Sequence, residues 1–191
     1  MITLVFATNN AHKAKEVEQI LGSGYSIKTL KDVGCLEDIE ETQDTILGNA
    51  ILKANYLKDK YGFDCFSEDT GLEVDALDGA PGVHTARYAG EQRSAVDNIS
   101  LLLSNLKNAE HRTARFRTVI AIQMNDQLTT LEGVCEGSIA TECRGEGGFG
   151  YDPVFIPKGY EQTFAEISDD VKNKISHRGI ATLKLMEFLK L

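Results

Sequence analysis

Residues 2–13 read ITLVFATNNAHK, and this stretch decides the fold. The apolar run from Ile2 to Ala7 is rich in β-branched and aromatic side chains, which is typical of a buried strand, and it stops at the polar residues 8–13. From Ala14 to Leu21, apolar side chains recur at helical spacing. We therefore expect a strand, a polar turn and a helix in direct succession.

The turn between this strand and helix combines groups that bind anions. Backbone N–H groups and the positive end of the helix dipole point at one place, where amide, hydroxyl and ammonium side chains are added by Thr8, Asn9, Asn10 and Lys13. A phosphate group fits such a site. Asn and Thr are also ordinary helix N-caps, so capping alone is the competing interpretation.

Extended and helical patterns alternate along the rest of the chain, which favours an α/β architecture with a mixed sheet. The patterns predict strands at 25–30, 63–66, 72–74, 115–124 and 128–134, with 136–142 continuing the meander, and helices that begin at Thr45, at Val96 and near Ser176. Asn125-Asp126 is typical of a hairpin turn, Gly62 closes the helix that begins at Thr45, and residues 35–41 form an acidic loop.

Composition excludes several classes of function. The formal net charge of −9, with the basic residues spread along the chain, argues against a nucleic-acid polymer as partner. No stretch approaches the roughly 20 apolar residues of a membrane span, and the start lacks a signal peptide, so we expect a soluble cytoplasmic protein with no membrane partner. Four cysteines without a C-x-x-C pair indicate reduced thiols rather than a zinc site or a disulfide framework.

Two acidic segments carry more polar chemistry than packing requires. Thr42, Thr45, Asn49 and Lys53 share a polar face of the helix that follows Glu40-Glu41, and a solvated helix face is the alternative. Residues 67–71, Ser-Glu-Asp-Thr-Gly, form an acidic turn between two short strands, and a plain surface turn is the alternative there. One carboxylate from each segment would hold Mg²⁺ against a phosphate, and a carboxylate could activate a water.

Two further segments could bind a base. Residues 145–153 form a glycine-dense loop with two aromatics and a carboxylate, suited to stacking on a base or to a tight structural turn. Ser176-His177-Arg178-Gly179 opens the last helix after Lys172 and Lys174, although cations oppose the dipole at a helix start. Donors of His177 and Arg178 would suit the keto group of a purine.

Taken together, these residues resemble the inosine triphosphate pyrophosphatase family, also called Ham1-like. The resemblance runs in order through nearly the whole chain, as T-x-N-x-x-K at 8–13, E-E-T at 40–42 followed by N-A-x-x-K at 49–53, SEDTGLEVDAL at 67–77, GAPGVHTARYAG at 79–90, GFGYDPVF at 148–155 and SHRG at 176–179.

The resemblance implies a fold and a reaction. The fold would be an elongated central mixed β-sheet flanked by helices, forming one domain over residues 1–191 with two lobes and a nucleotide cleft between them, and the chain would form a homodimer. The reaction would be Mg²⁺-dependent hydrolysis of ITP, dITP or XTP to the nucleoside monophosphate and pyrophosphate, which cleanses the nucleotide pool.

The resemblance also implies residue roles. Glu41 and Asp69 would bind Mg²⁺, Asp69 would activate the attacking water, and Glu68 competes with Asp69 for either role. The substrate would be held by Thr8, Asn9, Asn10, Ala11, His12, Lys13, Lys53, Thr70, Phe149, Gly150, Tyr151, Asp152, Lys172, His177 and Arg178. We expect replacement of His177 or Arg178 by alanine to lower turnover far more than fold stability.

Two alternative functions and one local departure stay open. The alternatives are a Maf-type pyrophosphatase acting on other modified nucleotides, against which 148–153 and 176–179 argue, and a nucleotide sensor without turnover. Within the resemblance, Gly48 stands where many relatives carry Glu, and Gln43 stands where Gly is common. We expect the start of that helix to have its own local shape, with no proposed ligand lost.

Overall fold

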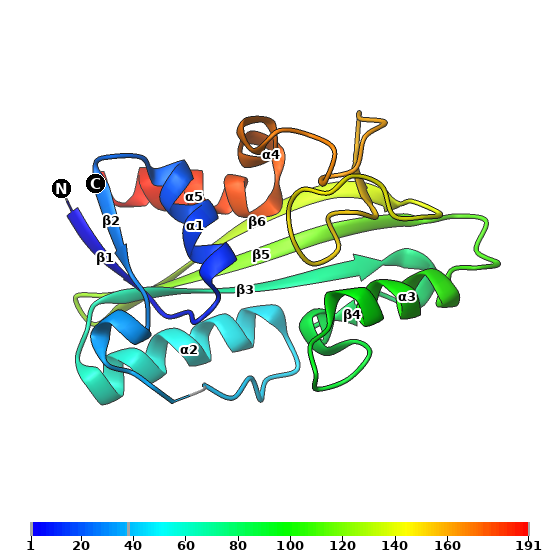
Figure 1. Ribbon diagram of the computed structural model, residues 1–191. Helices are drawn as coiled ribbons and strands as arrows, with labels where there is room; N and C mark the ends of the chain where they lie inside the picture. The colour runs from blue at the N-terminus through cyan, green and yellow to red at the C-terminus, as the bar shows by residue number, and fades with distance from the viewer. Residues whose placement is uncertain (1, 38, 191) are drawn as a thin grey trace. The chain divides into compact units, whose positions relative to one another are not determined.

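The computed structural model describes residues 2–37 and 39–190, and these residues form a mixed seven-stranded sheet with flanking helices (Figure 1). The elements are β1 (Ile2–Phe6), α1 (Ala11–Leu21), β2 (Tyr25–Lys28), α2 (Ile46–Tyr61), β3 (Cys65–Val74), β4 (Pro81–Gly82), α3 (Ala95–Asn105), β5 (Thr113–Met124), β6 (Gln127–Ile139), β7 (Phe155–Pro157), α4 (Asp169–Ile175) and α5 (His177–Phe188), with single 3₁₀ turns at 31–33, 75–77 and 85–87.

The strand order is β2-β1-β3-β5-β6-β7, and β4 pairs with β3. β1 runs parallel to both β2 and β3, with Val5 opposite Cys65 and Phe6 opposite Phe66. β6 is antiparallel to β7. Asn125 and Asp126 have φ values of 50° and 60°, as a two-residue hairpin turn of the primed type requires. The predicted mixed α/β fold is therefore confirmed.

Several predicted boundaries need correction. Residues 65–74 form one continuous strand, so the prediction of two short strands around an acidic turn at 67–71 is wrong. α1 begins at Ala11 rather than Ala14, because the Asn10 side chain caps the N–H groups of residues 12 and 13. Residues 136–139 belong to β6 itself and do not form a further strand. Position 38 of the predicted acidic loop lies outside the described residues.

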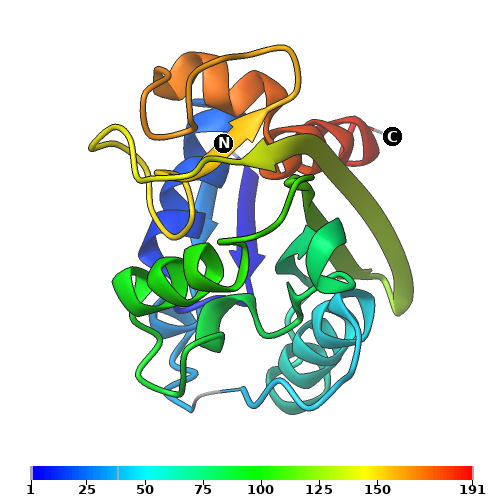
Figure 2. The same ribbon diagram turned by 90° about the vertical axis from the view of Figure 1, so that its right-hand side faces the viewer.

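The chain divides into two compact units. The first comprises residues 1–69, 118–133 and 178–191, and the second comprises 70–117 and 134–177. In the first unit, apolar residues of β1 and β3 pack with α1 and α5, and Figure 2 shows β1 between α1 and α2. The stacked rings of Phe6 and Phe66, with centroids 4.4 Å apart, lie in this core. The sequence-based prediction of one domain with two lobes stays a prediction.

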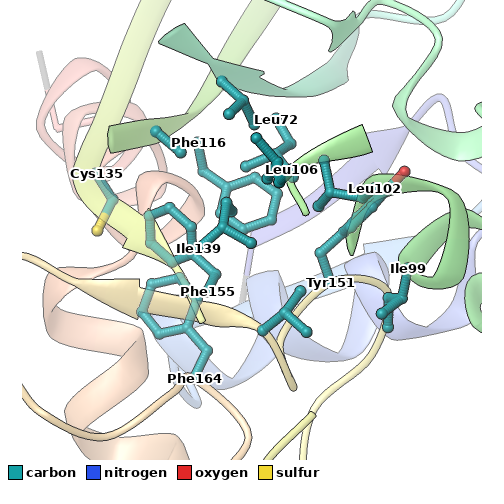
Figure 3. Packing of buried hydrophobic residues seen from close by; sticks show 13 residues of the cluster. Leu72, Ile99, Leu102, Leu106, Phe116, Cys135, Ile139, Tyr151, Phe155 and Phe164 are labelled. Carbon is teal, nitrogen blue, oxygen red and sulfur yellow. The ribbon is translucent and has the colours of Figure 1, made fainter. Parts of the chain in front are cut away.

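The second unit has its own core, which Figure 3 shows. Phe116 lies at its centre, with ring centroids 4.7 Å from Phe155 and 6.3 Å from Phe164. Leu102 and Leu106 of the α3 region belong to the same buried cluster. Among residues 2–37 and 39–190, no helix is both long and apolar enough to cross a membrane.

Candidate active site

The polar side chains of strand β3 lie on two opposite faces of the strand. Alternate residues of a strand point in opposite directions, and Figure 1 shows α1 and α5 on one side of β3 and α2 on the other. Ser67 and Asp69 contact α2, since the Ser67 hydroxyl donates to the carbonyl of Ala50 and Asp69 contacts Lys53. Glu68 instead contacts side chains of α1 and α5. The neighbouring carboxylates therefore belong to different networks.

The first network joins Glu41, Lys53 and Asp69. The Lys53 ammonium donates to Glu41 Oε1 at 2.6 Å and to Asp69 Oδ1 at 3.0 Å. Lys53 and Asp69 are almost completely buried, whereas the Glu41 side chain is 24% exposed. Two carboxylates thus converge on a single cationic group, one of them from the segment that precedes α2.

Burial and charge act against each other in this network. Burial raises the pKa of Asp69 above its usual value, and the nearby Lys53 and Lys13 offset only part of that rise. Burial also opposes the charged form of Glu41, but Lys53, Lys13 and Asp69 together outweigh it and the pKa of Glu41 is lowered. Burial works against the Lys53 ammonium, and the two carboxylates overcome it, so the pKa of Lys53 is raised. Lys13 interacts electrostatically with both acids, so these charges lie close together.

The second network surrounds Glu68, whose side chain has no exposure. Arg178 of α5 donates from Nε and Nη2 to the two Glu68 oxygens at 2.8 and 2.6 Å, and from Nη1 to Glu16 at 2.6 Å. The Lys13 ammonium lies 3.3 Å from Glu68 Oε1. Burial disfavours the charged guanidinium, but Glu68 and Glu16 outweigh it, so the pKa of Arg178 is raised. Glu68 is therefore neutralised by a two-pronged guanidinium, which Asp69 lacks.

The predicted anion-binding turn lies at the junction of β1 and α1. Asn10 Oδ1 accepts hydrogen bonds from the backbone N–H groups of His12 and Lys13, and Thr8 Oγ1 accepts one from Asn10. Asn9, Asn10, Ala11 and His12 are exposed. Asn10 is therefore the N-cap of α1, and phosphate binding by these residues stays a prediction.

The glycine loop is held by a buried ion pair in the second unit. Asp152 Oδ2 accepts from the Lys172 ammonium at 2.7 Å and from the Phe149 backbone N–H at 2.7 Å. The Lys172 ammonium also lies 5.2 Å from the centroid of the Phe149 ring, within cation–π range. Gly148 has φ of +72°, and a Cβ there would collide with the Asp152 carboxylate. The loop is therefore shaped around Asp152.

Two residues predicted to touch the base are parts of the core. Tyr151 is buried in the second unit's cluster and donates its hydroxyl proton to the carbonyl of Thr85 at 2.9 Å. The His177 ring, also buried, stacks on Phe116 with centroids 4.5 Å apart and an interplanar angle of 17°. These contacts fix both side chains, and their contact with a base stays a prediction.

The structure brings the predicted residues into two sets. The first set lies in the first unit, which also holds residues 8–12, and its contacts link Glu41, Lys53, Asp69, Lys13 and Arg178. Phe149–Asp152 and Lys172 are linked within the second unit, which also holds Thr70 and His177. The shared polar face predicted for α2 is wrong for Thr42, which precedes the helix, and for Thr45, which is its N-cap.

Sequence reasoning missed Glu16 and placed Arg178 only at the base. Glu16 lies three residues after Lys13 on α1, so both side chains share one helix face, and that spacing was the available signal. Arg178 donates hydrogen bonds from Nε, Nη1 and Nη2 to carboxylates of the first unit, which gives it a structural role, and its contact with a base stays a prediction.

Comparison with known proteins shows the family of the chain. The model of the Ham1 family matches residues 4–188. The chain belongs to the Ham1 family. It is 54% identical over 190 residues to a protein of Porphyromonas gingivalis named dITP/XTP pyrophosphatase, covering 99% of this chain and 98% of that one. A Bacillus subtilis protein of the same name is 47% identical over 190 residues, covering 97% and 96%.

Solved structures of the family have the same fold. The Ham1 protein of Staphylococcus aureus superposes with a TM-score of 0.89 at 37% identity, covering 98% of both chains. A HAM1 protein from Coxiella burnetii superposes with a TM-score of 0.90 at 36% identity, covering 100% of this chain and 99% of that one. The mixed sheet with its flanking helices is therefore the family fold.

Proposed function

We propose that this protein is a nucleoside-triphosphate pyrophosphatase that hydrolyses dITP, ITP and XTP to the monophosphate and pyrophosphate. Family membership and the names of the relatives support this class of enzyme and this purine substrate. Removal of such nucleotides from the cytoplasmic pool would be its purpose, and a homodimer its working form.

One observation carries the proposal: the carboxylates of Glu41 and Asp69 converge on the Lys53 ammonium. The two carboxylates place oxygen atoms within 2.6 and 3.0 Å of one ammonium, so they lie close enough together to act on one ligand. This donor set fits Mg²⁺, a hard cation that takes one or two carboxylates together with phosphate oxygens. Mg²⁺ held there would polarise the phosphoryl group and neutralise its developing charge.

The residues then divide the work. Asp69, whose pKa is raised by burial, takes a proton from the water whose oxygen attacks the α-phosphorus of the α–β anhydride. The phosphorus–oxygen bond of that anhydride breaks, and pyrophosphate leaves with the bonding electrons. Lys53 holds Asp69 in place, and Lys13 with the turn at 8–12 binds the phosphate oxygens.

Base recognition falls to the second set of residues. Phe149 and Lys172 offer a ring and a cation, while Asp152 shapes the loop at 148–152. His177 would offer a donor to the 6-keto group, with Thr70, Gly150 and Tyr151 completing the surroundings, and Arg178, although it belongs to the first set, would offer a second donor. Adenine presents an amino group in place of that keto group, which leaves buried donors unpaired at a cost of about 1 to 3 kcal/mol.

The test is a side-by-side assay of dITP, XTP, ITP, dATP and dGTP, with and without Mg²⁺, followed by pyrophosphate detection. We expect pyrophosphate from the 6-oxopurine nucleotides with Mg²⁺ and none without it. Release of orthophosphate in the absence of an inorganic pyrophosphatase would contradict the proposed bond cleavage. Absence of product from every nucleotide would favour a sensor.

The Asp69→Asn variant tests the proposed base. We expect kcat to fall by about 10²-fold or more, as for loss of a general base, while nucleotide still binds in a filter or calorimetric assay. Asp126→Asn is the matched control, because Asp126 is 89% exposed at a turn position with positive φ that Asn adopts readily. A kcat of Asp69→Asn close to that of the parent would refute the assignment of Asp69 as the general base.

A further inference from the structure

The segment that carries Glu41 is fastened to α2 by Asn49. The buried Asn49 side chain accepts the Gln43 backbone N–H through Oδ1 at 2.9 Å and donates from Nδ2 to the Gln43 carbonyl at 3.2 Å. Both backbone groups of Gln43 are thus paired with one side chain. This double contact fixes the backbone two residues after Glu41.

The spacing of these contacts along residues 41–43 matches their spacing along α2. Asn49 and Lys53 are four residues apart on α2, a rise of about 6 Å. Gln43 and Glu41 are two residues apart, which an extended chain spans in about 6.6 Å. Asn49 contacts Gln43, and Lys53 contacts Glu41. Residues 41–43 therefore run antiparallel to the helix, held at both ends.

Gly48 leaves room for the Gln43 side chain in this arrangement. A Cβ added at Gly48 would lie 2.8 Å from Gln43 Cβ, 3.2 Å from Gln43 Cγ and 2.9 Å from Thr45 Oγ1. Distances below 3.0 Å require atoms to shift. Glycine is a poor helix former, so its presence in the first turn of α2 has a packing reason.

We propose that Gln43, Gly48 and Asn49 form a clamp that positions the Glu41 carboxylate beside Lys53 and Asp69. The role rests on the proposed function of Glu41 as a metal ligand. None of the three clamp residues is assigned a contact with substrate, so they are positioning residues that act through Glu41. A side chain at position 48 would push Gln43 outward and carry Glu41 away from Lys53.

The Gly48→Ala variant tests the clamp by two readouts. The Mg²⁺ concentration for half-maximal turnover should rise about tenfold, as for loss of a group that orients a metal ligand. Independently of turnover, Glu41→Gln should shift the melting temperature of the parent, by loss of its contact with Lys53, and shift it much less in a Gly48→Ala background. Leu47→Ala is the matched control, since Leu47 is 45% exposed in the same helical turn.

Rescue separates the clamp from a general effect on folding. Gln43→Gly removes the atoms that an alanine at 48 would meet at 2.8 and 3.2 Å, so the Gln43→Gly/Gly48→Ala double variant should regain at least half of the lost Mg²⁺ response. An unchanged Mg²⁺ response in Gly48→Ala, an undiminished melting shift from Glu41→Gln, or failure of the rescue would each overturn the clamp. Should the parent lack turnover, the proposed function fails, and the melting comparison still decides the clamp.

Discussion

Replacing Arg178 by methionine should destabilise the protein strongly, because the buried Glu68 carboxylate would lose its guanidinium partner. Glu68 would lose both guanidinium contacts and keep its ion pair with Lys13 at 3.3 Å. Breaking a buried ion pair by removing one partner costs about 3 to 5 kcal/mol. Lys13 remains and Glu16 is partly exposed, so we place the loss at about 3 kcal/mol, the lower end. That is a large share of the roughly 5 to 15 kcal/mol that stabilises a typical domain.

Urea unfolding of the parent and of Arg178→Met measures this loss directly, and a fall in midpoint at constant slope would report it. Arg115→Met is the matched control: Arg115 contacts the carboxylates of Glu73, Asp75 and Glu136, yet its side chain is 29% exposed. Partly exposed pairs contribute little, so we expect a loss of about 1 kcal/mol. Comparing the two variants shows whether the stability lost depends on the burial of the arginine or on the number of its carboxylate partners.

A second substitution tests the physical cause. In the Arg178→Met/Glu68→Gln double variant, position 68 carries no charge that needs the guanidinium. The double variant should therefore regain more than half of the stability that Arg178→Met loses. Equal losses in Arg178→Met and Arg115→Met, or a double variant less stable than Arg178→Met, would refute the reasoning. The structure thus corrects the sequence-based expectation for Arg178, since its loss should impair folding as well as turnover.

Two further predictions concern stability and thiol reactivity. Thr182 is fully buried in α5, and within the described residues its hydroxyl has no hydrogen-bond partner. The Thr182→Val variant should therefore match or exceed the parent in melting temperature, and a fall of several degrees would contradict this. Burial raises the pKa of Cys65 and of Cys135 to about 12. Because the unfolded chain releases these protons near pH 9 and the folded chain holds them to about pH 12, stability should fall as pH rises between these values. At pH 8, iodoacetamide should label only the exposed Cys143 in the folded protein and all four cysteines in urea; rapid labelling of Cys65 in the folded state would be the opposite result.

Local signals in the sequence predicted most elements. The hairpin at Asn125-Asp126 is specified by two residues that accept positive φ, and α2 ends at Gly62 because that residue adopts the left-handed conformation. The start of α1 was misplaced since Asn10 serves both interpretations, as a cap and as part of a polar turn. Boundaries that depend on one side chain's hydrogen bonds are visible only once the backbone is known.

The central part of β3 escaped sequence reasoning for a different reason. Ser-Glu-Asp-Thr-Gly at 67–71 has the composition of an exposed turn, and burying its charges is costly unless each is paired. The partners come from far along the chain: Lys53 lies 16 positions from Asp69, and Arg178 lies 110 positions from Glu68. No local pattern reveals such pairing, so a buried charged strand is mistaken for a loop.

That same error hid the difference between Glu68 and Asp69. In a turn, neighbouring carboxylates are nearly interchangeable, and either could serve as ligand or base. In a strand they point to opposite faces, so Glu68 meets a guanidinium that contacts both of its oxygens, while Asp69 contacts the Lys53 ammonium, as does Glu41. Asp69 lies beside Glu41 and Lys53, so strand alternation supports choosing Asp69 over Glu68 as the proposed metal ligand and base.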